Sequence, residues 1–266
     1  MEQIPANIRE AVENDEQISI NGFTLFPILM REYRQFEAAK FALLLRQGSL
    51  PVKYAVLPYL QALYAMDYDA VKETGQPMGF TAGLLTMLAL SMRFPADALL
   101  KQAGMEYSDE EQRLVAAVRF RAGENILRLT PADFDRIRPV IAAQNGLELP
   151  DEAENADLVE ADNDIAARGS VSVKADYRTL MASVARDQRC RVRDLMDYTI
   201  REFTDLKNAI EREKNYTLCK MAEYSGVTFK GGNPCPSWCY DAAEKGTSLI
   251  SMSTFMAGPG SAAAMK

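Results

Sequence analysis

The sequence predicts a mainly α-helical protein with one or two β-hairpins, divided into two regions by an acidic segment. Three observations support this fold class. Apolar residues recur at three- and four-residue spacings over most of the chain, two short segments have hairpin patterns, and residues 151–164 hold seven acidic and no basic residues. We therefore expect a hairpin-and-helix domain over residues 1–147, an acidic linker over 148–164, and a helical region with a C-terminal turn and a mobile tail over 165–266.

The first predicted hairpin lies in residues 16–26, which read EQISINGFTLF. Asn21 and Gly22 suit the two positive-φ positions of a type I′ turn, and the flanking residues alternate between apolar and polar. Helical periodicity then predicts four helices, over residues 30–47, 51–67 with a kink at Pro58, 78–92, and a short one from Pro95 to Gly104.

A second hairpin is predicted over residues 113–129, and a helix follows it directly. Thr130 is suited to the N-cap of this helix, Pro131 to its first position, and Gly146 to its end. The order of hairpin, helix and a Gly-to-Leu-Pro stop occurs in both halves of residues 1–150. Two explanations of this order remain open: an internal duplication, and a common local arrangement that occurs twice by chance.

Two further helices are predicted in the C-terminal region, over residues 174–188 and 191–224. The longer one has an apolar face near the helical period, formed by Val192, Leu195, Ile200, Phe203, Leu206, Ile210, Leu218 and Met221. After it come a short extended piece, VTFK, and the segment GGNPCPSWCYD at residues 231–241. Its glycines and prolines predict a stiff turn.

Several classes of function are disfavoured by composition. The chain contains no histidine, which removes Ser-His-Asp and Cys-His catalysis and most catalytic metal sites. No phosphate-binding glycine motif is present, and the net charge of −7 disfavours binding to nucleic acid. The N-terminus lacks the features of a signal peptide, and no apolar stretch is long enough to span a membrane. We therefore expect a non-enzymatic protein of the cytoplasm, without a cofactor and without a membrane or nucleic-acid partner.

The four cysteines allow one metal-binding alternative. A zinc site would use Cys190, Cys219, Cys235 and Cys239, but only the last two have the close spacing of a zinc knuckle. Cys190 and Cys219 are isolated on predicted helical segments, where free cysteine is commonly a small buried side chain. We favour the absence of a metal and keep the four-thiolate site as an alternative.

Trp238 is the only tryptophan, and it lies between prolines and cysteines. The favoured interpretation is an anchor that packs on the long helix of its own region. The alternative is an exposed ring that binds a partner, since prolines would hold the segment in one conformation. The candidate partner-binding residues are Trp238, Tyr240, Pro236 and Phe255.

Four segments together resemble the tail assembly chaperones and related tail-region proteins of tailed bacteriophages and prophages. They are INGFTLFPILMREYRQF, followed by LLLRQGSLPVKYAVLPYLQAL, then FDRIRPVIAAQNGLELPDEAENADL, and finally YTIREFTDLKNAIEREKNYTLCKMAEYSGVTFKGGNPCPSW. The resemblance covers most of the chain and lies in the order of these segments. It implies a small, acidic, helix-rich protein of the host cytoplasm that binds the tape-measure protein, the tail-tube subunit or both, without catalysis.

Two other functions remain open from the sequence. One is a minor structural protein of the virion, in the tail or the connector. The other is a small zinc-stabilised regulatory protein, which would need the four cysteines. The sequence also leaves self-association into a homo-oligomer open.

Overall fold

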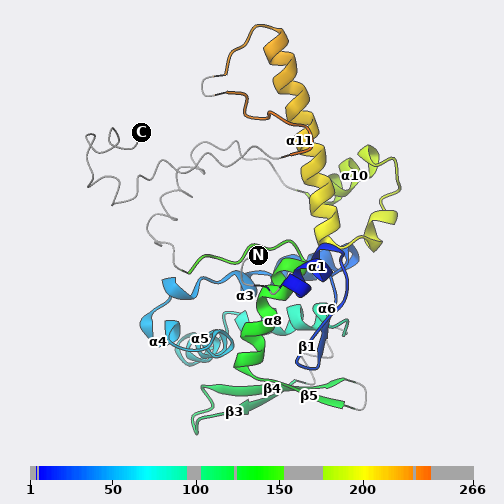
Figure 1. The fold of residues 1–266 in the computed structure, drawn as a ribbon. Coiled ribbons are helices and arrows are strands. Elements are labelled where there is room, and N and C mark those ends of the chain that lie inside the picture. The colour runs from blue at the N-terminus through cyan, green and yellow to red at the C-terminus, as the bar shows by residue number, and fades with distance from the viewer. Residues whose placement is uncertain are drawn as a thin grey trace, which may run out of the picture. The chain divides into compact units, whose positions relative to one another are not determined.

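The computed structural model describes residue 4 and residues 6–94, 103–122, 125–152, 176–229 and 232–240 (Figure 1). The chain divides into two compact units, Met1–Leu206 and Lys207–Lys266. The segment 148–164, predicted as the acidic linker, lies mostly outside the described residues. The boundary between the units falls within the long helix α11 (Ile200–Tyr224).

The first unit contains helices and two antiparallel sheets. The helices are α1 (Ala6–Glu13), α2 (Tyr33–Ala39), α3 (Phe41–Leu44), α4 (Val52–Ala55), α5 (Tyr59–Thr74), α6 (Phe80–Ser91), α8 (Pro131–Gln144) and α10 (Tyr177–Asp187), with the short 3₁₀ turns η1 (Met30–Glu32), η2 (Gln47–Ser49) and η3 (Asp194–Asp197). The strands are β1 (Ile18–Ile20), β2 (Phe23–Leu25), β3 (Gly104–Tyr107), β4 (Val115–Ala122) and β5 (Asn125–Leu129).

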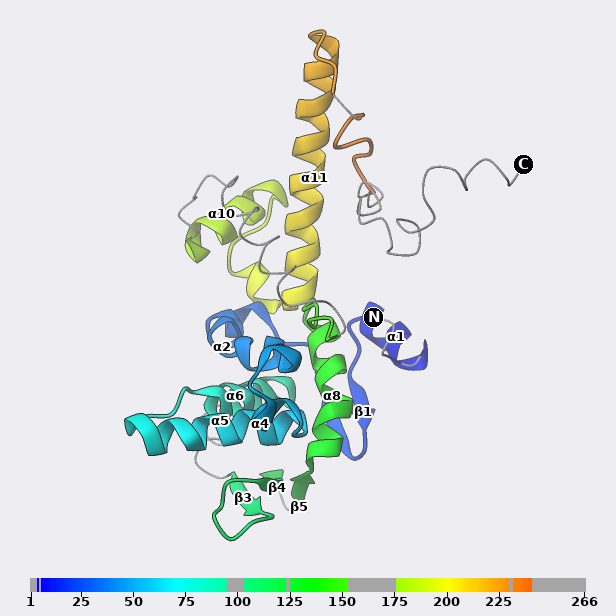
Figure 2. The same ribbon diagram turned by 90° about the vertical axis from the view of Figure 1, so that its left-hand side faces the viewer.

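The mainly α-helical fold class is wrong, because the described residues form a mixed α and β fold. Gly104, expected to end a short helix, begins β3, which pairs with β4, and β4 pairs with β5. The predicted hairpin is therefore two strands of a three-stranded sheet. The connection from β3 to β4 is closed by the carboxylate of Asp109, which accepts the N–H groups of Arg113 and Leu114 at 3.1 and 2.8 Å. Figures 1 and 2 show this sheet at the end of the unit where α8 begins.

The N-terminal hairpin has the predicted turn. Asn21 and Gly22 have φ angles of 51° and 83°, as a type I′ turn requires, and Ile20 pairs with Phe23 across it. The Phe23 ring packs on Phe120 of β4 at a centroid distance of 6.2 Å. The two small sheets therefore contribute to one core.

Helix α8 begins and ends as its sequence predicts. The Thr130 hydroxyl accepts the backbone N–H of Asp133, and the Asp133 carboxylate accepts the backbone N–H of Thr130, which is a reciprocal cap. After the helix, Gly146 has a φ of 65°, a conformation that favours glycine. On the buried side of α8, Phe134, Ile137 and Ile141 have no exposed surface.

Buried polar groups of the first unit have partners that fix neighbouring elements. The carboxylate of Asp67, on α5, accepts the N–H groups of Gly79, Phe80 and Thr81 at 2.9, 3.2 and 2.6 Å, so it caps the start of α6. Near the end of α8, the Asn145 side chain accepts the N–H of Ile28.

A third polar group, the Arg138 side chain, joins α8 to the end of α3. The Arg138 guanidinium lies 3.6 Å from the centroid of the Tyr59 ring and donates to the carbonyl of Leu43. Tyr59 is held in turn by its hydroxyl, which donates to the carbonyls of Ala42 and Leu45. Burial raises the pKa of Tyr59 to about 12, so this hydroxyl stays protonated.

Residues 176–206 complete the first unit. Tyr177 of α10 stacks on Tyr33 at 4.9 Å, and its hydroxyl donates to the carbonyl of Met30. A β-bridge pairs Leu29 with Thr199. Thr199 also caps α11 reciprocally with Glu202, so the helix begins at Ile200 rather than at residue 191 as the periodicity predicted.

Candidate protein-binding surface

The described part of the second unit consists of α11 from Lys207 onward and a segment after it. Helix α11 ends in a capped turn, in which Gly226 has a φ of 86° and the N–H of Val227 donates to the carbonyl of Ala222. Residues 232–240, which we name the turn segment, then run back along the helix.

Two contacts hold the turn segment on α11. Near its start, the Asn233 amide donates to the Glu223 carboxylate at 2.7 Å, and near its end the carbonyl of Cys239 accepts from Arg212 at 3.4 Å. Since Glu223 lies after Arg212 in the helix, the segment runs antiparallel to α11. A hydrogen bond from the Lys220 ammonium, followed by the one from Asn233, lowers the pKa of the Glu223 carboxyl group.

Exposure alternates along the turn segment. Asn233, Cys235 and Ser237 are half-buried, whereas the residues between and after them are exposed: Pro234, Pro236, Trp238, Cys239 and Tyr240. An extended chain directs successive side chains to opposite sides, so the first set faces the helix and Pro236 and Trp238 face solvent. The end of the segment is folded by Ser237, whose hydroxyl accepts the N–H groups of Cys239 and Tyr240.

Trp238 does not pack on α11 as the favoured interpretation predicted. Trp238 is 62% exposed, and Tyr240, two residues later, is 75% exposed. The prolines and the Ser237 turn position Trp238 at the outer edge of the segment, whereas Tyr240 also lines the side toward α11. We name Pro236 and Trp238 the turn edge. Phe255, the fourth predicted partner-binding residue, lies outside the described residues.

A second exposed apolar group lies on α11 itself. It consists of three residues at successive spacings of three, which we name the α11 stripe: Leu218, Met221 and Tyr224. Their exposed fractions are 64%, 61% and 89%. On a helical projection, Met221 and Tyr224 lie on the side of α11 opposite the residues that hold the turn segment. Sequence periodicity identified Leu218 and Met221 as apolar-face residues, but it gave no sign that this part of the face is uncovered.

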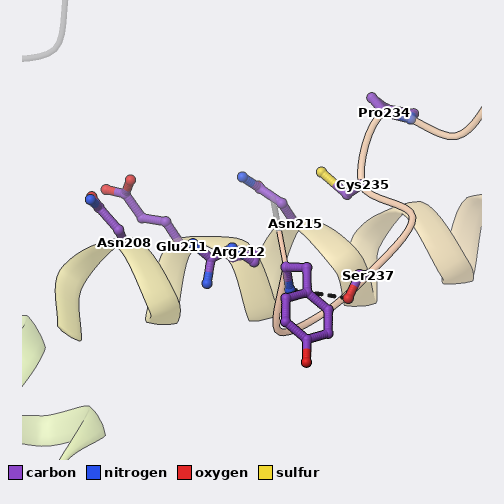
Figure 3. Close-up of a pocket in the computed structure, with 8 residues that line it drawn as sticks. Asn208, Glu211, Arg212, Asn215, Pro234, Cys235 and Ser237 are labelled. Atoms are coloured by element: carbon purple, nitrogen blue, oxygen red, sulfur yellow. Dashed lines mark hydrogen bonds between the residues drawn. The ribbon is translucent and has the colours of Figure 1, made fainter. Parts of the chain in front are cut away.

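A polar cleft lies between α11 and the turn segment. Its volume is about 310 Å³, and its lining residues are Asn208, Glu211, Arg212 and Asn215 from the helix and Pro234, Cys235, Ser237 and Tyr240 from the segment. Figure 3 shows the four helical residues in a row along α11, with Cys235 and Ser237 of the segment next to the Asn215 end of that row. Mixed amide, carboxylate and guanidinium groups suit hydrogen bonding to a peptide backbone or polar side chains at the margin of an interface.

The four cysteines do not assemble into the metal site that the sequence left open. Cys190 belongs to the first unit, Cys239 is exposed, and Cys219 and Cys235 lie between α11 and the turn segment. Among the described residues, no three of the residue types that commonly bind metals lie close enough together to hold an ion. The zinc-stabilised alternative therefore gains no support from these positions.

No protein-family model, no curated protein and no solved structure matches this chain. Within the described part of the chain, no helix has the length and apolar character needed to cross a membrane.

Proposed function

We propose that this protein is a non-enzymatic assembly factor that binds other proteins through its second unit, and that its partners are phage tail proteins. The observation that supports protein binding is the solvent exposure of Trp238. Tryptophan and tyrosine are enriched among the residues that dominate interfaces, since each buries a large rigid area when a partner covers it. A proline-bordered segment lowers the entropy lost when the ring is fixed in a complex.

The α11 stripe supports the same function. Leucine, methionine and tyrosine on the exposed face of a helix resemble the anchors of helix-in-groove recognition, which recur at helical spacing. Methionine also adapts to partners of different shape, because its side chain is unbranched and flexible. Two separate apolar surfaces suit a factor that binds a long helical partner and another subunit at once.

The phage assignment comes from the resemblance of the four segments. It names the tape-measure protein and the tail-tube subunit as partners, and it places the protein in the host cytoplasm. A minor structural protein of the tail or connector would present the same surfaces. Mass spectrometry of purified particles separates the two functions, because an assembly factor is absent from mature particles and a structural protein is present.

Co-expression with the tape-measure and tail-tube proteins encoded beside it tests the proposal. We expect the tagged protein to retain at least one of them in a pull-down, and Trp238→Ala to reduce the retained amount by about tenfold or more, as for an interface hot spot. Val56→Ala is the matched control, since Val56 is an apolar residue of the first unit that is 73% exposed. Failure to retain either protein would refute the proposed function.

A further inference from the structure

Two thiols of the second unit interact where the turn segment lies on α11. Cys219 lies on α11 and Cys235 lies on the segment, and both are free and half-buried. Cys235 is one of the alternate residues that point toward the helix, between Asn233 and Ser237. Its backbone is fixed, because its N–H donates to the Asn233 side chain at 2.8 Å.

The two contacts of the turn segment place this pair independently. Asn233 is bonded to Glu223 and Cys239 to Arg212, so position 235 lies between these two contacts. Cys219 lies between Arg212 and Glu223 on the same face of α11, seven residues after one and four before the other. An antiparallel segment held at both contacts therefore has Cys235 beside Cys219, and the two thiols interact.

We propose that Cys219 and Cys235 are a thiol-oxidation site, at which a peroxide forms an intramolecular disulfide that closes the turn segment onto α11. In the first step one thiolate attacks an oxygen of hydrogen peroxide. An S–O bond forms, the O–O bond breaks, and hydroxide leaves as water after taking up a proton. The second thiolate then attacks that sulfur, forming the S–S bond and releasing the oxygen as a second water. The two thiols lose two electrons and two protons, and the peroxide accepts them.

The environment of Cys235 sets the pH dependence of this reaction. Desolvation, followed by the neighbouring Cys219 thiol, raises the pKa of Cys235. A raised pKa lowers the thiolate fraction of Cys235 at neutral pH, so attack by Cys235 is slow there and faster as the pH rises. In this respect the site differs from a low-pKa redox catalyst.

The other cysteines are less suited to pair with Cys235. Cys239 is on the same segment, but its sulfur lies 3.5 Å from the Ser237 hydroxyl and its residue is exposed. Cys190 belongs to the other compact unit. Both residues therefore serve as controls that leave the proposed pair intact.

Closing the loop between positions 219 and 235 restricts the open states of the turn segment. From the chain entropy lost in a loop of this size, the equilibrium constant for opening of the turn segment should fall by at most about a hundredfold. The oxidised chain then presents Pro236 and Trp238 on a segment that stays on α11. Any effect on partner binding rests on the proposed function, whereas the disulfide itself does not.

Peptide mapping of the full chain without any partner tests the site. After treatment with hydrogen peroxide, we expect a non-reducing digest to contain one linked peptide pair, Cys219 with Cys235, lighter by two hydrogen atoms and separated by dithiothreitol. The same linkage should form in Cys239→Ser and in Cys190→Ser. It should be lost in Cys219→Ser and in Cys235→Ser, and protease cleavage of the turn segment should slow only in the chains that form it.

Three results would overturn this inference. They are a Cys235–Cys239 linkage as the main product, disulfide-linked dimers as the main product, and oxidation of Cys219 and Cys235 to separate acids without linkage. Because no partner is present in the assay, each of these results leaves the proposed function untouched.

Discussion

The two units differ in the solvent exposure of their large apolar side chains. In the first unit, Phe134 and Leu63 have no exposed surface, and helices and sheets cover them from several sides. In the second unit, none of the described residues 207–229 and 232–240 is buried, and Trp238 is 62% exposed. The comparison indicates that the first unit is stabilised by its own core, whereas the second presents apolar surface that a partner can cover.

The units also differ in their polar contacts. The first unit uses buried groups such as Asp67 and Asn145 to satisfy backbone N–H groups of distant segments. In the second unit, the contacts that hold the turn segment involve surface groups such as Glu223 and Arg212. Buried bonds of the first kind are costly to remove, and exposed bonds of the second kind contribute little to stability.

The largest expected effect comes from a buried aromatic residue. Phe134→Ala should lower the free energy of unfolding by about 4 kcal/mol, because it removes a large buried side chain and leaves a cavity. Trp238→Ala should lower it by less than about 0.5 kcal/mol, because the ring is mostly in solvent. Urea denaturation followed by circular dichroism measures both. Equal losses for the two variants would contradict the difference in burial between Phe134 and Trp238.

The cap of α6 should give the next largest effect. Asp67→Ala removes the acceptor of three backbone N–H groups and should cost about 3 kcal/mol. Asp205→Ala is the matched control, since the Asp205 side chain is 68% exposed and pairs with Arg201 one turn away, and it should cost less than about 0.5 kcal/mol. If Asp67→Ala unfolds at the same urea concentration as the wild type, the cap does not stabilise the first unit.

Acid should weaken the first unit through Asp69. Hydrogen bonds from Arg113 are the largest cause that lowers the pKa of Asp69 below its usual value of 3.8. A carboxyl group with a lowered folded-state pKa contributes stability above its unfolded pKa and loses it as the pH falls below about 4. Comparing the wild type with Arg113→Ala at pH 7 and at pH 3 should show a difference of about 1 kcal/mol at pH 7 that shrinks at pH 3. A difference that is the same at both values would exclude this pair as the cause.

The smallest effect should come from the α11 stripe. Leu218→Ala should change the free energy of unfolding by less than about 0.5 kcal/mol, whereas Phe203→Ala, on the buried start of the same helix, should cost about 3 kcal/mol. Thermal or urea unfolding of the two variants compares a buried and an exposed position of the same helix. A large loss for Leu218→Ala would mean that the stripe is covered within the free protein.

Local signals in the sequence were sufficient for several elements. Asn21 and Gly22 predict their turn because few other residues adopt positive φ, and Thr130 and Pro131 predict the start of α8 because a helix end needs an acceptor there. By contrast, β3 is four residues long and depends on pairing with β4, and so short a strand has no distinct pattern in its own sequence. Asp109, in the loop after β3, is a residue type that favours turns, and it could have indicated this connection.

The candidate surface was predictable in part. Cysteine, proline and tryptophan spacing identified the turn segment, and periodicity identified Leu218 and Met221 as apolar-face residues. Periodicity cannot distinguish a covered face from an uncovered one, because both have the same spacing. The side toward which Trp238 points depends on the contacts of Asn233 and Cys239 with α11, and these join residues ten or more positions apart.

Fluorescence of Trp238, the only tryptophan, tests whether a partner covers the turn edge. We expect red-shifted emission and efficient acrylamide quenching in the free protein. When the tape-measure or tail-tube protein that the chain retains is added, we expect blue-shifted emission and protection from quenching. Blue-shifted, protected emission in the free protein, or a complex in which emission and quenching are unchanged, would contradict the proposed role of Trp238 in partner binding.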